Sequence, residues 1–112
     1  MLPVMPYDQI EALWEEHCRI PFPRGYAGKE IEGIDLVLLD TLAAGCISTF
    51  LGGGGRLDPE RAKLLGRPGG LADEIDQIMP GLEGEAARHF DRLGRLSRAV
   101  LARVQSSKRR AH

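Results

Sequence analysis

IDLVLLDTLAAGCISTFL, residues 34–51, is the most apolar stretch of the chain, and it runs directly into four glycines. At helical spacing its apolar side chains fall into two adjacent rows. One row is Leu38, Leu42, Cys46 and Phe50, and the other is Leu39, Ala43, Ile47 and Leu51. A helix that is apolar over so much of its circumference is normally surrounded by other helices. The stretch therefore predicts a central helix.

The polar residues of this stretch argue against a membrane span. A span needs about 20 mainly apolar residues, whereas this stretch contains Asp35 and Asp40, and a carboxylate is costly inside a bilayer. We interpret Asp40 as a solvated or arginine-paired surface charge, the alternative being a buried functional acid. We expect the least covered face of the helix to carry Val37, Asp40, Thr41, Ala44 and Ser48.

The residues before the central stretch predict one amphipathic helix and a loop. From Pro6 to Arg19 the core-facing positions repeat at helical spacing, and they are Ile10, Leu13, Trp14, His17 and Cys18. Pro21 and Pro23 end this helix, because proline lacks the backbone donor and disfavours helical angles in its predecessor. The loop 20–33 follows, with a short helical turn expected at residues 29–32.

The residues after the central stretch predict a broken helix and a long last helix. Asp58, Pro59 and Glu60 form a helix start, with a capping acid and a first-turn proline. The breaker at residues 66–70 divides this helix into pieces 59–65 and 71–79, yet apolar residues keep their phase across it. We therefore predict two pieces roughly in line, with a kink near Pro68. The last helix is expected at about 84–105.

These elements predict an all-α fold, a single four-helix bundle with the central helix at about 34–51. The whole chain, 1–112, is expected to form one domain, because its length suits one compact core. Short flexible ends are expected at about 1–5 and 106–112. The alternative is an open arrangement that completes its core by forming a homodimer, since the central helix is very apolar for three short neighbours to cover.

The net charge of −1 hides an asymmetry along the chain. Residues 1–83 carry 7 Lys+Arg against 14 Asp+Glu, whereas residues 84–112 carry 8 against 2. The basic residues 84–112 can pair with the acidic residues 1–83 of the same chain, with those of a second copy, or with an anionic partner. The two cysteines lie in separate predicted helices, and residues 1–6 lack the basic and apolar regions of a secretory signal, so we expect none. We therefore expect reduced thiols and a cytoplasmic protein.

Five arginines of the last helix are the candidate binding residues. Arginines at such spacing can contact successive phosphates. The alternative is an ordinary solvated face, because Glu85 and Asp91 lie within helical reach of these arginines and no aromatic residues interleave them. The five residues are Arg88, Arg92, Arg95, Arg98 and Arg103.

The histidines do not match a known metal motif. A four-helix carboxylate site uses Glu-x-x-His on two helices, but Trp14 stands three residues before His17 and Ala86 three before His89. We interpret His89 and Glu85 as a surface pair four residues apart. We therefore expect no metal and no cofactor.

No catalytic constellation is recognisable, so the first functional hypothesis is a small non-enzymatic interaction or regulatory protein. It would bind a protein partner, or a second copy of itself, through a helical face. The second hypothesis is nucleic-acid binding through the arginine-rich last helix and the basic tail. The third is a small-ligand binder or enzyme that uses an interhelical cavity beside Trp14, Cys18, Cys46 and Phe50.

Overall fold

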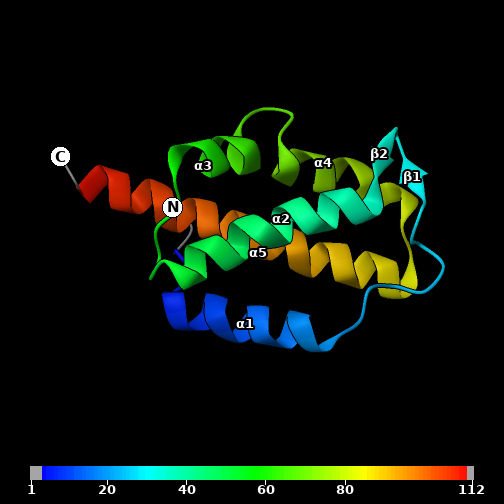
Figure 1. The fold of residues 1–112 in the computed structure, drawn as a ribbon, viewed down its shortest axis with the longest axis horizontal. Coiled ribbons are helices and arrows are strands. Elements are labelled where there is room, and N and C mark those ends of the chain that lie inside the picture. Colours follow the sequence, from blue (N-terminus) through cyan, green and yellow to red (C-terminus); the bar gives the residue numbers. More distant parts are fainter. Residues whose placement is uncertain (1–3, 111–112) are drawn as a thin grey trace.

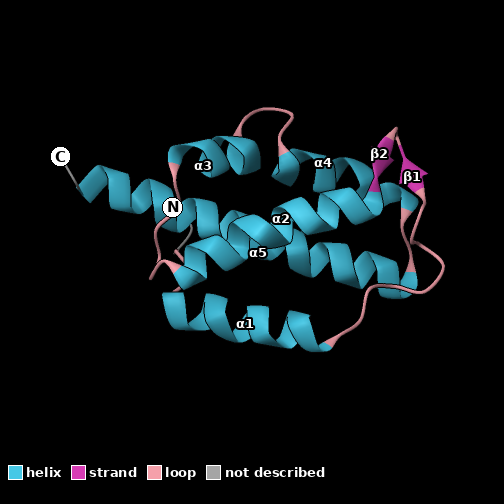
Figure 2. Ribbon diagram, in the orientation of Figure 1, coloured by secondary structure: helices cyan, strands magenta, loops and turns pink. Residues whose placement is uncertain are grey.

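The computed structural model describes the backbone of residues 4–110 and the side chains of residues 4–107. The helices are α1 (Tyr7–Arg19), α2 (Leu36–Gly52), α3 (Pro59–Gly66), α4 (Leu71–Ile78) and α5 (Gly84–Arg110). A single turn of 3₁₀-helix, η1 (Met79–Gly81), follows α4, and a two-stranded antiparallel hairpin joins β1 (Glu30–Ile31) to β2 (Ile34–Asp35). Figure 2 shows how small this sheet is beside the helices.

The bundle predicted from the sequence is confirmed, with α3 and α4 as the two pieces of its third helix. In Figure 1, α2 and α5 cross in the middle of the molecule, α1 lies along one side of them, and α3 and α4 lie along the other. Within the described chain, no helix is both long enough and apolar enough to cross a membrane.

The break between α3 and α4 depends on glycine. A Cβ atom at Gly70 would lie 2.7 Å from the carbonyl oxygen of Leu64 and 2.9 Å from that of Arg67. These are backbone atoms that cannot move aside cheaply, so a side chain at Gly70 is incompatible with this turn. Asp58 starts α3 as predicted, because its carboxylate accepts a hydrogen bond of 3.0 Å from the backbone N–H of Arg61.

Two predicted boundaries are wrong. The helical turn expected at residues 29–32 is instead the hairpin, because Glu32 and Gly33 adopt φ angles of 55° and 75° and reverse the chain. Positive φ at both central positions is the geometry of a tight two-residue hairpin turn. The last helix continues to Arg110 rather than ending near Gln105. The predicted flexible ends include residues 1–3 and 111–112, which lie outside the described residues.

The covered face of α2 agrees with the predicted one only in part, since Val37, Thr41 and Ser48 are exposed as expected but other positions differ. Its buried residues are Leu36, Leu39, Ala43, Cys46, Ile47 and Phe50. Leu38 and Leu42 were placed in a core row, but their side chains are 55% and 37% exposed. Asp40 and Ala44 were placed on the least covered face and are half-buried. The reason is that α5 packs against the side of α2 that carries Asp40. The side that carries Leu38 therefore faces outward.

The adjacent leucines 38 and 39 test this orientation as a matched pair. We expect Leu39→Ala to lower the free energy of unfolding by about 2–5 kcal/mol, because it leaves a cavity in the core. Leu38→Ala removes a largely exposed side chain and should cost no more than about 0.5 kcal/mol. Urea unfolding of dilute protein measures both. Equal losses in the two variants would contradict the observed orientation of α2.

Candidate functional site

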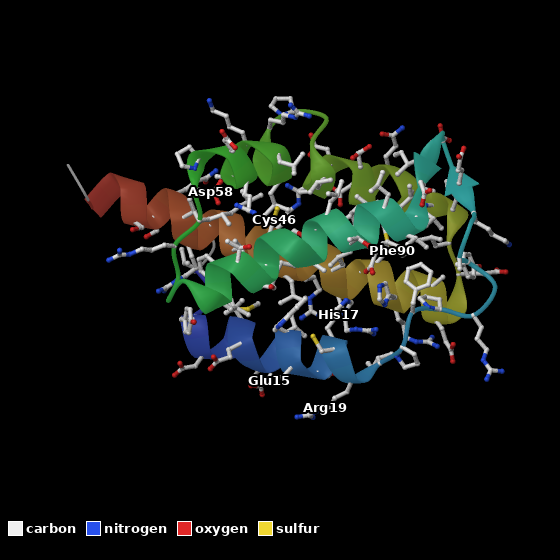
Figure 3. All side chains as sticks on the ribbon, in the orientation of Figure 1. Glu15, His17, Arg19, Cys46, Asp58 and Phe90 are labelled. Atoms are coloured by element: carbon white, nitrogen blue, oxygen red, sulfur yellow. The ribbon has the colours of Figure 1, made fainter. Side chains whose placement is uncertain are left out.

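Three residues that are far apart in the sequence meet where α1, α2 and α5 pack together. They are His17, Asp40 and His89, which we call the His–Asp–His cluster. One nitrogen or oxygen atom from each residue lies within 4.8 Å of the corresponding atoms of the other two. Figure 3 places His17 on the side of α1 that faces the α2–α5 pair. The cluster is therefore a polar site within a helical interface.

The tightest contact of the cluster joins α5 to α2. Nε2 of His89 lies 2.7 Å from Oδ1 of Asp40. His89 is 4% exposed, and its other ring nitrogen, Nδ1, is buried without a hydrogen-bond partner among the described residues. A buried polar atom left unpaired costs about 1–3 kcal/mol. The ring is thus oriented by a carboxylate through one nitrogen, while its second nitrogen lacks a partner.

His17 is held by a cation and by two rings. Nε of Arg92 donates a hydrogen bond of 3.3 Å to Nδ1 of His17. The ring of Trp14 stacks on His17 at a centroid distance of 5.9 Å, and the ring of His89 lies 4.5 Å away. A neutral histidine that accepts through Nδ1 carries its hydrogen on Nε2. The contact with Arg92 therefore favours the neutral form of His17.

The pKa of His17 is lowered to about 4. The main cause is burial, which penalises the charged imidazolium, and the neighbouring His89 and Arg92 act in the same direction. Asp40 opposes the shift. At neutral pH His17 is consequently an uncharged imidazole, which is the form that can accept a hydrogen bond or bind a metal ion.

Two phenylalanine rings pack against His89. Phe22, from the loop after α1, and Phe90, the next residue in α5, meet the ring edge to face at centroid distances of 5.3 Å and 5.1 Å. These rings exclude water from the histidine, so charges in the cluster are less screened than they would be at the surface.

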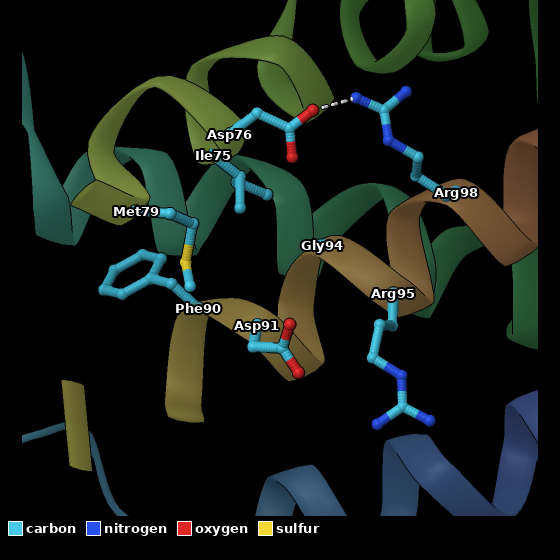
Figure 4. Close-up of a pocket in the computed structure, with 8 residues that line it drawn as sticks. All are labelled: Ile75, Asp76, Met79, Phe90, Asp91, Gly94, Arg95 and Arg98. Carbon is cyan, nitrogen blue, oxygen red and sulfur yellow. Dashed lines mark hydrogen bonds and ion pairs between the residues drawn. The ribbon is translucent and has the colours of Figure 1, made fainter. Parts of the chain in front are cut away.

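The five candidate arginines are placed in different surroundings. Arg98 forms an ion pair with Asp76 and a second one of 3.4 Å with Asp73, both in α4. Figure 4 shows Arg98 reaching toward Asp76 while Arg95, three residues earlier, points the other way. Arg88 and Arg92 line a pocket near the His–Asp–His cluster, and Arg103 is half-buried. Binding through these arginines remains a prediction.

The two cysteines lie in different places. Cys18 is exposed on α1, whereas Cys46 is buried and its Sγ lies 3.9 Å from the carbonyl oxygen of Arg61 in α3. Burial raises the pKa of the Cys46 thiol. The predicted cavity beside both cysteines therefore does not bring the two thiols together, and Cys46 is a protonated core thiol.

Sequence reasoning missed the cluster because two of its interpretations are wrong. Asp40 is half-buried and pairs with a histidine rather than with an arginine, and His89 is buried rather than part of a surface pair with Glu85. One signal was present in the sequence. His17 shares the core-facing side of its predicted helix, and His89 precedes the core residue Phe90. No spacing rule joins histidines 72 residues apart, so the tertiary fold was needed.

Two imidazoles and a carboxylate, in an interface with little access to water, form a set of ligands that divalent transition-metal ions bind. Comparison with protein-family models, with curated proteins and with solved structures finds no match to this chain. Its function is therefore inferred from the geometry of the site.

The lowered pKa of His17 makes the stability of the metal-free protein depend on pH. Between the ordinary histidine pKa of 6.5 and the folded value of about 4, the unfolded chain binds more protons than the folded one. Stability should therefore be unaffected by His17 above pH 6.5 and fall as the pH drops toward 4, by up to about 3 kcal/mol in total. Urea unfolding in EDTA across this range measures the effect.

Replacement of His17 by Gln provides the control for this measurement. The variant lacks the titrating group, so its stability should change less steeply between pH 6.5 and pH 4 than that of the wild type. Titrating groups away from His17 contribute equally to both proteins. Parallel curves for the two proteins would contradict the assignment of the shift to His17.

Proposed function

We propose that this protein binds a divalent transition-metal ion, of the Zn²⁺ class, through His17, His89 and Asp40. The observation that carries the proposal is the convergence of these three residues from α1, α2 and α5.

The chemistry of the residues suits such an ion. Zn²⁺ in sites with an open position takes three protein ligands, and a set of two histidines and one carboxylate is among those it uses. Non-haem Fe²⁺ takes the same set. Zinc–nitrogen bonds of about 2.0–2.1 Å place donor atoms roughly 3.4 Å apart. The donor atoms of the cluster lie within 4.8 Å of one another, so the widest spacing must shrink on binding. The atoms Nε2 of His89 and Oδ1 of Asp40, which are 2.7 Å apart, must separate slightly.

Arg92 competes with the ion. Its Nε occupies Nδ1 of His17, and its positive charge opposes a second cation nearby. An ion on Nδ1 of His17 would take the place of Arg92. An ion on Nε2 would require the ring hydrogen to move to Nδ1, which could then no longer accept from Arg92, so metal binding displaces Arg92 in either case. The competition has a testable consequence. Removal of Arg92, although it is a polar residue of the site, should increase the affinity for the metal ion.

We expect Zn²⁺ to bind with one ion per chain, and Co²⁺ to bind with visible absorption bands typical of a site with nitrogen and oxygen donors. His17→Gln, Asp40→Asn and His89→Gln should each weaken binding by more than about 10–100-fold, which is the loss that mutation of a residue behind a metal ligand already causes. Arg92→Gln should strengthen it, because the competing cation is gone. Calorimetric titration of protein first treated with EDTA measures the affinities.

Cys18→Ser is the matched control, because this exposed thiol stands next to His17 and can bind zinc by itself. Its affinity should equal that of the wild type. Zinc binding that survives in His89→Gln, or that disappears in Cys18→Ser, would place the ion elsewhere and refute the His–Asp–His cluster as the metal site.

A second candidate function is self-association through α2. Val37, Leu38 and Leu42 expose apolar side chains on this helix, and a Cβ atom at Gly45, on the same exposed side, would meet open space. A small residue beside two leucines lets a second helix approach closely, and a face of this kind can complement itself about a twofold axis. We therefore propose a second copy of the chain as the partner of this face.

Light scattering on a sizing column tests self-association. We expect a dimer for the wild type and a monomer for Leu38→Glu, because a carboxylate cannot be buried in an apolar interface without a partner. Ile20→Glu is the control, since Ile20 is a comparably exposed apolar residue that lies outside this face. A monomeric wild type, or equal disruption by both variants, would refute the proposal. The exposed face of α2 would then be assigned to a protein partner other than a second copy of this chain.

A further inference from the structure

A second feature lies next to the His–Asp–His cluster, in a pocket of about 480 Å³ between the loop after α1 and the first turns of α5. Figure 1 shows this loop passing beside the start of α5. Phe22 and Pro23 belong to its loop side, whereas Arg88, His89 and Arg92 come from α5. The volume is that of a site for a small organic molecule.

The charges in this pocket are predominantly positive. Arg24 joins Arg88 and Arg92, and Glu85 is the acidic residue of the lining. None of the three arginines forms an ion pair within residues 4–107. By contrast, Arg98 on the other side of α5 is neutralised by α4. The pocket thus gathers three guanidinium groups, from two separate segments, and the single carboxylate of Glu85 balances only part of their charge.

Two residues of this lining, His89 and Arg92, also belong to the buried His–Asp–His region. His89, which is 4% exposed, lines the pocket and has a ring nitrogen without a partner among the described residues. Arg92 is anchored through Nε by its hydrogen bond to His17, which leaves its two terminal nitrogens for another acceptor. An anchored guanidinium is pre-organised for an oxyanion, because less side-chain freedom is lost when the ligand binds.

We propose that this pocket binds a small phosphate monoester, with Arg24, Arg88 and Arg92 contacting the phosphate oxygens. Guanidinium groups match the geometry of phosphate oxygens and form charge-assisted hydrogen bonds with them. The loop residues Phe22 and Pro23 supply an apolar wall for the organic group.

The balance of charge selects the phosphate over a carboxylate. Three arginines and Glu85 leave a formal charge of +2 in the pocket, and a phosphate monoester carries about −1.5 to −2 at neutral pH. A carboxylate, with a single negative charge, would leave the pocket positive. The ligand is therefore a dianion with a small apolar substituent.

The pocket shares His89 and Arg92 with the His–Asp–His cluster, so a bound phosphate would lie beside the proposed metal ion. This adjacency rests on the proposed function, whereas the phosphate site itself does not. The shared arginine also separates the two sites by experiment, because Arg92→Gln should strengthen metal binding and weaken phosphate binding.

Phenyl phosphate is a suitable probe, titrated calorimetrically at fixed ionic strength into EDTA-treated and into zinc-loaded protein. We expect one site per chain in both forms, with weaker binding of inorganic phosphate and of benzoate. Arg24→Gln and Arg88→Gln should each weaken phenyl phosphate binding roughly tenfold or more, as expected for a lost charge-assisted hydrogen bond. Arg95→Gln is the control, since it removes the same charge from α5 outside this pocket, and should change the affinity less than about twofold.

The outcomes separate the phosphate site from the metal site. Binding to EDTA-treated protein that is lost in Arg24→Gln and Arg88→Gln supports the pocket, even where zinc titrations show no metal binding. Absence of binding in both forms overturns it. If Arg95→Gln weakened phenyl phosphate binding equally, the ligand would be attracted by the overall positive charge of α5. If zinc-dependent binding survived in Arg24→Gln and Arg88→Gln, the ligand would be bound to the metal ion. Either result overturns the arginine pocket.

Discussion

The packing of the other helices against α5 is the constraint on which this structure depends. The apolar stripe of α5 includes Phe90, Leu93, Leu96 and Val100, all of which are fully buried. This helix contacts α1, α2, α3 and α4. Burial of apolar surface drives such packing at about 25 cal/mol per Å², so the orientation of α5 determines which face every other helix must turn inward.

The polar cluster exists because α5 presents a histidine within this apolar stripe. His89 precedes Phe90 and is carried into the interface by the same packing that buries the phenylalanine ring. Asp40 then supplies a hydrogen-bond acceptor from α2. A buried polar group costs free energy unless it is paired, and the pairing here is incomplete. An apolar pair would fill the same space without this cost, which is the physical argument for the metal-binding role proposed above.

The proposed metal ion and the proposed phosphate site meet at Arg92. This residue donates to His17 through Nε and lines the neighbouring pocket. A cation at the cluster and an oxyanion in the pocket act on it in opposite ways, because the first repels the guanidinium and the second attracts it. Occupation of one site therefore favours occupation of the other if Arg92 turns from His17 toward the pocket. This coupling would require the Arg92 side chain to turn, but no movement of the helices.

The sequence by itself determined the all-α fold, the central apolar helix and the break near Pro68, because helical periodicity, capping residues and glycines are local signals. It also determined that five arginines follow one another along the last helix. Only the tertiary structure decided that Leu38 faces outward and Asp40 inward, since two apolar rows on one helix leave its rotation undetermined. The meeting of His17, Asp40 and His89 was likewise decided by helix packing. Residues this far apart in the chain share no periodicity, and they become neighbours only when three helices bury their apolar faces together.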